Sequence, residues 1–187
     1  VPGNESLTPI LGTHFVLGTA WYPAPDLKVS VEGYAKTYED YPVSTQYPFL
    51  SLANSGDQYS VSGMLIPMVS SGTGWSRGVE FYLQKRLTGH LYGQVSYSYS
   101  RTRHAALDGV ERPGSFDIPH VLSLVGGYRL NDTWEFSAKF TYASGRPTTP
   151  LDLEASQAQN RTIYDAARIN AERIPDYHRL DVRGDYR

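Results

Sequence analysis

Two long polar segments of the chain carry the side chains best suited to hold a ligand. Aromatic rings stack on sugars or apolar groups, and a guanidinium forms paired hydrogen bonds with carboxylate or phosphate oxygens. The first segment contains Tyr47, Phe49, Tyr59 and Met64. The second contains Tyr164, Arg168 and Arg173. We predict that these residues bind a ligand, and their mixture suits sugars, peptides or anionic chelates without selecting among them.

Residues of the types that catalyse reactions or bind metals are present without the spacing those tasks need. Five histidines are scattered with no pattern such as H-E-x-x-H: His14, His90, His104, His120 and His178. The glycine-rich stretch Ser70 to Gly74 lacks the P-loop lysine. Two acidic pairs could hold calcium but lack the EF-hand pattern, and we interpret them as solvated loop charges: Asp108 with Glu111 and Asp152 with Glu154. We therefore expect no enzymatic activity, no cofactor and no bound metal.

The elements that must position these segments are seven two-faced strands. In the clearest, Trp134 to Tyr142, every even-numbered residue is apolar and every odd-numbered residue is polar. Successive side chains of a strand point to opposite faces, so this stretch has one apolar and one polar face. The predicted strands are Thr13 to Pro23, Leu27 to Asp40, Gly78 to Leu87, Leu91 to Thr102, Val121 to Leu130, Trp134 to Ser144 and Tyr177 to Arg187. One helix is predicted in the remaining segments, from Thr162 to Arg173, where alanine and other helix formers gather.

Short and long connections alternate between the predicted strands. The short ones are turns at residues 24–26, 88–90 and 131–133. The long ones span residues 41–77, 103–120 and 145–176. In an antiparallel meander, successive connections lie at opposite ends of the sheet, so all turns share one end and all loops share the other. This asymmetry is typical of bacterial outer-membrane barrels, which have short periplasmic turns and long extracellular loops.

The polar faces of the strands carry charges of both signs, as a water-filled or plugged lumen tolerates. The charged residues predicted to face the lumen are Glu80, Glu135, Lys139, Arg179, Asp181 and Arg183. Aromatic residues gather near strand ends, like the girdles of a membrane barrel: Trp21, Tyr22, Trp134, Tyr142, Tyr177 and Tyr186. The same two-faced strands also fit a soluble antiparallel sandwich or barrel that binds a carbohydrate or protein through its loops, and this alternative stays open.

Composition and charge narrow the class of protein. The chain has 187 residues, a formal net charge of -2 and no cysteine. Near-neutral charge without a block of lysine and arginine argues against nucleic acid as a partner. The lack of cysteine excludes a disulfide framework and a thiolate metal site. No run approaches the roughly 18 apolar residues of a transmembrane helix, and no signal peptide is visible. We expect that an exported protein of this kind has lost its signal or is part of a longer chain.

The number of strands favours the explanation that the chain is part of a longer one. Bacterial single-chain barrels have an even number of strands, from about eight upward. Seven strands leave the last one without a hairpin partner, so we expect the chain to be a slice of a larger barrel. An eighth strand hidden within Gln58 to Met68 would instead make it a complete small barrel.

Several stretches resemble the late barrel strands of TonB-dependent outer-membrane receptors. They are Arg77 to Thr88 followed by Leu91 to Ser100, then Phe116 to His120, Tyr142 to Pro147 and Asn170 to Asp181. The resemblance covers most of the chain from Thr13 onward and implies that residues 1–187 are the C-terminal portion of a barrel of about 22 strands, without its plug domain. It implies a place in the bacterial outer membrane, surrounded by lipid. It also implies import of a scarce siderophore, vitamin, sugar or peptide, with energy that TonB delivers through the plug of the parent protein.

Overall fold

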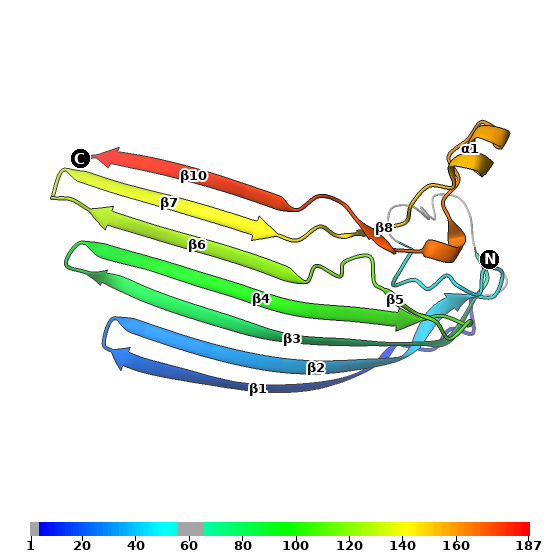
Figure 1. Cartoon of the computed structure of the whole chain (residues 1–187). Helices are drawn as coiled ribbons and strands as arrows, with labels where there is room; N and C mark the ends of the chain where they lie inside the picture. The colour runs from blue at the N-terminus through cyan, green and yellow to red at the C-terminus, as the bar shows by residue number, and fades with distance from the viewer. Residues whose placement is uncertain (1–3, 56–65) are drawn as a thin grey trace.

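One large antiparallel sheet makes up most of the molecule (Figure 1). The computed structural model describes residues 4–55 and 66–187. Seven strands follow one another in the order β1-β2-β3-β4-β6-β7-β10, and the short β5 pairs with β4. The wall strands are β1 Leu11–Ala24, β2 Leu27–Ser44, β3 Met68–Thr88, β4 Leu91–Ala105, β6 His120–Arg129, β7 Trp134–Ala143 and β10 Tyr177–Tyr186. All seven predicted strands are therefore present, and the predicted antiparallel meander is confirmed.

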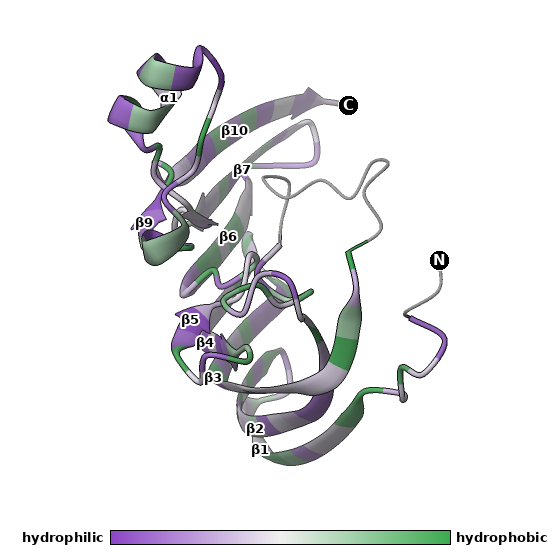
Figure 2. Cartoon of the chain, turned by 90° about the vertical axis from the view of Figure 1, so that its right-hand side faces the viewer, coloured by the Kyte–Doolittle hydropathy of each residue, from purple (hydrophilic) through white to green (hydrophobic). Residues whose placement is uncertain are grey.

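The three tight turns lie at one end of the sheet and the long connections lie at the other (Figure 1). Seen from the loop end, the sheet forms an open arc from β1 to β10, and polar and apolar residues alternate along its ribbons (Figure 2). A soluble sandwich would need a second sheet packed on one face. The described residues supply only one other sheet, the two-stranded pair β8 (Pro147–Thr148) and β9 (Glu172–Arg173).

The first long loop is shorter than predicted, because β2 and β3 continue pairing beyond their predicted ends. The ladder runs on to Ser44 opposite Met68, through irregular register near Asp40, whose φ is 58°. Gly72 fits this irregular stretch because a Cβ there would lie 2.9 Å from the Tyr41 carbonyl oxygen. The first loop therefore covers residues 45–67 rather than 41–77. The proposed eighth strand, Gln58 to Met68, falls mostly outside the described residues, and Met68 itself begins β3.

The predicted helix from Thr162 to Arg173 is wrong. Only a single 3-10 turn, η1 (Ala166–Arg168), forms there, and the helix α1 lies earlier, at Leu153–Gln159. The capping residues explain the shift. The side chain of Asp152 accepts a hydrogen bond from the Ala155 amide and starts α1, whereas the left-handed Asn170, with φ 54°, cannot continue a helix after η1.

An aromatic ring lies against a directly paired glycine at each of the three strand pairs that a long loop connects. Tyr34 of β2 covers Gly78 of β3, Tyr92 of β4 covers Gly127 of β6, and Phe136 of β7 covers Gly184 of β10. At Gly78 a Cβ would lie 2.7 Å from the Tyr34 ring, so a larger residue would displace it. We refer to these three contacts as the aromatic–glycine pairs.

Buried apolar side chains gather at the loop end of the wall. The buried apolar residues are Val43, Leu50, Met68, Ala106 and Ile169. The wall instead exposes large apolar side chains on one face, including Leu17, Leu180 and Val182. None of the helices within the described residues is long and apolar enough to cross a bilayer.

Candidate functional site

The polar face of the sheet brings the predicted charged residues onto one side of the wall. Lys139 pairs with Asp181, and Thr141 pairs with Arg179. Arg183 lies beside Ser137, and Glu80 lies between Glu32 and Ser98. Two guanidiniums also bind the next acid on the same face of β10: Arg179 holds Asp181 at 2.6 Å and Arg183 holds Asp185 at 2.7 Å. The strand register thus forms a polar surface on which most of these charged side chains lie beside an oppositely charged one.

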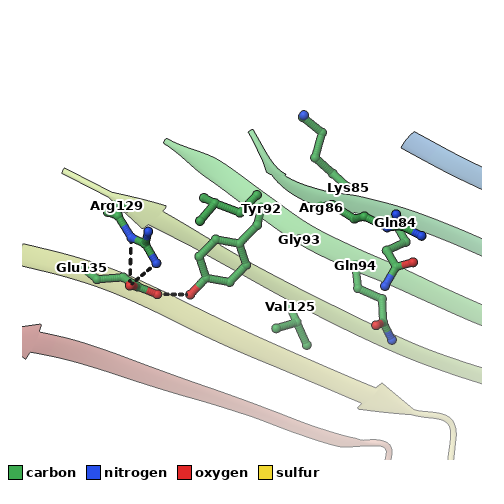
Figure 3. A pocket seen from close by; sticks show the side chains of 10 residues that line it. Gln84, Lys85, Arg86, Tyr92, Gly93, Gln94, Val125, Arg129 and Glu135 are labelled. Carbon is green, nitrogen blue, oxygen red and sulfur yellow. Dashed lines mark hydrogen bonds and ion pairs between the residues drawn. The ribbon is translucent and has the colours of Figure 1, made fainter. Parts of the chain in front are cut away.

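Glu135 is the centre of a hydrogen-bond network near the short turns (Figure 3). Its carboxylate accepts a hydrogen bond from the Tyr92 hydroxyl at 2.6 Å and lies 3.4 Å from the Arg129 guanidinium and 3.2 Å from that of Arg187. These contacts join β4, β6, β7 and the C-terminal residue. The network therefore fixes the Tyr92 ring over Gly127 and ties the wall strands together at this end.

A hollow of about 450 Å³ lies beside this network. Figure 3 shows the side-chain amides of Gln84 and Gln94 on neighbouring strands, with Val125 between them and Glu135. Amides, a phenol and ion pairs can donate and accept hydrogen bonds across a hydrated or polar surface. They do not form a nucleophile with an adjacent base, and the described residues contain no group of three or more acids and histidines close enough to hold a metal ion.

The long loops pack on one another and form a cap at the other end of the wall. Backbone hydrogen bonds join the first loop to the second: Asp108 N to Pro48 O at 3.1 Å, and Ser115 N to Ala53 O at 3.0 Å. The Asn170 side chain joins the third loop to the second through the Pro113 carbonyl at 2.8 Å. The described parts of the three loops therefore form one packed body rather than independent arms.

Asp117 and Arg173 form the tightest polar contact within this cap. The Asp117 side chain is fully buried, and it accepts hydrogen bonds from the Arg173 guanidinium at 2.5 Å and from the Thr102 amide at 2.7 Å. Arg173 also donates to the Gly145 carbonyl at 2.8 Å. The predicted ligand residue Arg173 is thus occupied in joining the second and third loops to β4. The sequence alone assigned Asp117 no role.

Asp176 anchors the third loop to the wall in a similar way. Its carboxylate accepts hydrogen bonds from the Tyr142 hydroxyl at 2.7 Å and from the Gly145 amide at 2.9 Å. The Tyr142 hydroxyl, followed by the backbone hydrogen bond, holds the pKa of Asp176 below its usual range.

The other predicted ligand residues fall into two groups. Tyr47 and Phe49 lie together in the first loop with ring centroids 5.9 Å apart. In the third loop, Tyr164 bridges to Leu151, and Arg168 forms an exposed ion pair with Glu172 at 2.8 Å. Tyr59 and Met64 lie outside the described residues.

A hollow of about 370 Å³ between β5 (Glu111–Pro113) and η1 holds five arginines: Arg101, Arg103, Arg112, Arg168 and Arg173. Four of them have acidic partners, because Arg112 binds Asp108 at 2.7 Å, Arg101 lies 3.6 Å from Asp117, and Arg168 binds Glu172 and Arg173 binds Asp117 as described above. Sequence analysis missed this arginine-rich hollow because its residues come from three separate parts of the chain.

Sequence analysis also missed a buried aromatic group beneath the cap. His104 is 5% exposed and lies 4.8 Å from the Tyr41 ring and 5.9 Å from the Tyr38 ring. Its Nδ1 atom has no hydrogen-bond partner among the described residues. Only its place on the polar face, opposite Gly74, could have been predicted from the alternation.

Comparison with known proteins agrees with this architecture. The family model for the TonB-dependent receptor-like β-barrel matches residues 1–187. Among solved structures, the FrpB iron transporter from Neisseria meningitidis (F3-3 variant) is similar, with a TM-score of 0.61 and 17% sequence identity. The match covers 98% of this chain and 25% of the FrpB chain. No curated protein matches significantly. The chain belongs to the family of TonB-dependent receptor-like β-barrels of the bacterial outer membrane.

Proposed function

We propose that this chain forms part of the wall of a receptor that imports a scarce ligand with energy delivered by TonB. The observation that carries the proposal is the arrangement of the sheet, which has one apolar and one polar face, tight turns at one end and a packed cap of loops at the other. An apolar face that meets lipid leaves the polar face for the lumen. The family match supports the same assignment.

The polar wall suits contact with a plug. The proposed plug belongs to the parent protein and would place its polar surface against residues such as Gln84, Gln94 and Lys139. TonB would then act through that plug. The ligand we propose is a scarce solute of the siderophore, vitamin, sugar or peptide class, bound first by the loop cap, because binding residues concentrate on loops held by a rigid scaffold.

A transport experiment tests the proposal directly. Cells that produce the full-length protein are given labelled ferric chelates, cobalamin, oligosaccharides and peptides, with and without functional TonB. We expect one class to accumulate only when both the protein and TonB are present. Accumulation that is independent of TonB, or absent for every class, would count against the proposal.

A loop replacement separates ligand capture from wall formation. The protrusion that carries α1 is closed at its base by hydrogen bonds from Asp152 N to Ile163 O and from Asp165 N to Pro150 O, both 2.9 Å. Residues 153–162 can therefore be replaced by Asn-Gly, which favours a two-residue hairpin turn. We expect an unchanged folded barrel on an unboiled gel and weaker uptake of the ligand identified above. Loss of the folded barrel would show that the protrusion is structural.

A further inference from the structure

Three arginines lie on the apolar face of the sheet, above its aromatic residues. The register of β3 with β4 pairs Arg77 with Arg101 and Trp75 with Arg103, next to the pairs Val79 with Tyr99 and Phe81 with Tyr97. The ladder is unbroken through these positions, so all eight side chains share one face. This is the face that meets lipid when the sheet forms part of a membrane barrel. We refer to Arg77, Arg101 and Arg103 as the outer arginine cluster.

The cluster lies beyond the apolar belt of the wall. In β4, Val95 lies midway between Leu91 and Tyr99 on this face. At about 3.4 Å per residue and a strand tilt of about 40°, Tyr99 lies about 10 Å from the level of Val95, Arg101 about 15 Å and Arg103 about 20 Å. The apolar band of an outer-membrane barrel is about 25 Å tall, so its edge lies about 12 Å from its middle. The outer arginine cluster therefore lies at the level of the lipid headgroups.

The positive charge of the cluster is only partly compensated by nearby acids. Arg103 and Arg77 form no ion pair with any described residue, and Arg77 instead lies 5.0 Å from the Trp75 ring. Arg101 lies 3.6 Å from Asp117, whose carboxylate is already held by Arg173 at 2.5 Å. Glu39 and Glu111 line a hollow together with Arg77 and Arg103, and Glu111 accepts a hydrogen bond from the Trp75 indole at 3.1 Å.

A mostly apolar hollow lies directly below two of these arginines. It has a volume of about 330 Å³, and its lining includes Ala35, Trp75, Val79 and Tyr99 together with Arg77 and Arg101. On the other side, Arg101 and Arg103 line the arginine-rich hollow beside β5. The surface thus combines guanidiniums that can bind phosphate oxygens with an apolar floor that can hold the first carbons of an acyl chain.

We propose that the outer arginine cluster binds the phosphorylated headgroup of a lipid in the outer leaflet. Guanidiniums bind phosphate in a bidentate manner, and basic residues at a membrane surface attract anionic lipid. The apolar floor favours a lipid over a free phosphate ion, since an ion would gain nothing from Val79 and Tyr99. This proposal rests on the membrane orientation in the proposed function, but it does not depend on transport or on TonB.

Native mass spectrometry of the full-length protein in detergent tests the proposal. The three probes are bisphosphorylated lipid A, the same lipid after removal of both phosphates, and inorganic phosphate. We expect the phosphorylated lipid to be retained and the dephosphorylated lipid to be lost. Each arginine replaced by glutamine should weaken retention about fivefold, and replacement of all three should weaken it roughly a hundredfold.

Matched variants keep the test decisive. The triple change Lys28→Gln, Arg179→Gln and Arg183→Gln removes the same charge from the polar face and should leave lipid retention unchanged. If the triple outer variant fails to fold, Arg103→Gln alone still serves, because it breaks no ion pair among the described residues.

Equal retention by the parent and the outer variants, or equal retention of the two lipids, would overturn the proposal. Displacement of the lipid by an equal concentration of inorganic phosphate would show an anion site rather than a lipid site. Uptake in these variants is a separate measurement, so failure of the transport proposal would not be mistaken for failure of this one.

Discussion

A pair of arginine substitutions at neighbouring positions of β6 tests the assignment of the two faces. Leu124 pairs with Val95 and Phe140 on the apolar face, whereas Ser123 pairs with Ser96 and Thr141 on the polar face. The two positions are adjacent in sequence and both lie in the interior of the wall. Their side chains point to opposite faces of the sheet.

The expected magnitude follows from depth in the membrane. Leu124 lies four residues from His120 and four from Tyr128, the ends of this face of β6. At about 3.4 Å per residue and a tilt of about 40°, each end is about 10 Å away, which places Leu124 near the middle of the apolar band. An arginine on the lipid face at that depth costs roughly 2 to 4 kcal/mol. An arginine at Ser123 can be hydrated, and its cross-strand neighbours are uncharged, so we expect a cost below about 1 kcal/mol.

The measurement is unfolding of the full-length protein in lipid vesicles by denaturant, followed by tryptophan fluorescence and by the mobility of unboiled samples on gels. We expect Leu124→Arg to lower the free energy of unfolding by at least about 1 kcal/mol more than Ser123→Arg does. Leu124→Ala separates the loss of apolar volume from the added charge. Equal destabilisation by the two arginine variants, or greater destabilisation by Ser123→Arg, would refute the assignment of the faces.

Three further predictions concern the cap and the wall. Arg173→Ala should cost about 2 to 3 kcal/mol of local stability, because the buried Asp117 carboxylate loses its closest cation and keeps only Arg101 at 3.6 Å. The loss should appear as faster hydrogen exchange in the loops with an unchanged wall. Gly127→Ala should destabilise the wall by about 1 to 3 kcal/mol, because its Cβ would overlap the Tyr92 ring, whereas Gly126→Ala, with its nearest neighbour at 3.9 Å, should be tolerated in the same denaturant assay. Because the pKa of Asp176 is lowered in the folded protein, its ionised carboxylate stabilises the cap above about pH 4, and this stabilisation is lost as pH falls through the folded-state pKa. Acid should therefore speed proteolysis of the third loop, and Asp176→Asn should remove that dependence on pH.

The wall could be predicted from sequence because its information is local. Alternation of polar and apolar residues sets the face of each side chain, and residues such as those at 131–133 set the tight turns. The continuation of β2 and β3 could not be predicted, because Pro42 and Gly72 resemble strand breakers and only the pairing between the two strands overrides them.

The cap could not be predicted for a different reason. Its contacts join residues that are far apart in the chain, such as Arg173 with Asp117 and Asn170 with Pro113. A composition rich in aromatic and arginine residues suggested ligand binding, but the structure uses Arg173 to hold two loops together. The helix was misplaced because alanine content was weighed above the capping carboxylate of Asp152.

The aromatic–glycine pairs have a consequence for how this barrel wall can change over evolutionary time. A tight turn dictates the register of the two strands it joins, but a long loop does not, so hairpins joined by long loops need another source of alignment. The pairs at Gly78, Gly127 and Gly184 place each ring over one glycine and so favour one register from within the wall. Because alignment does not depend on the loops, a loop can be lengthened, shortened or exchanged while the strands keep their partners. The loops can therefore diversify on a wall that stays the same.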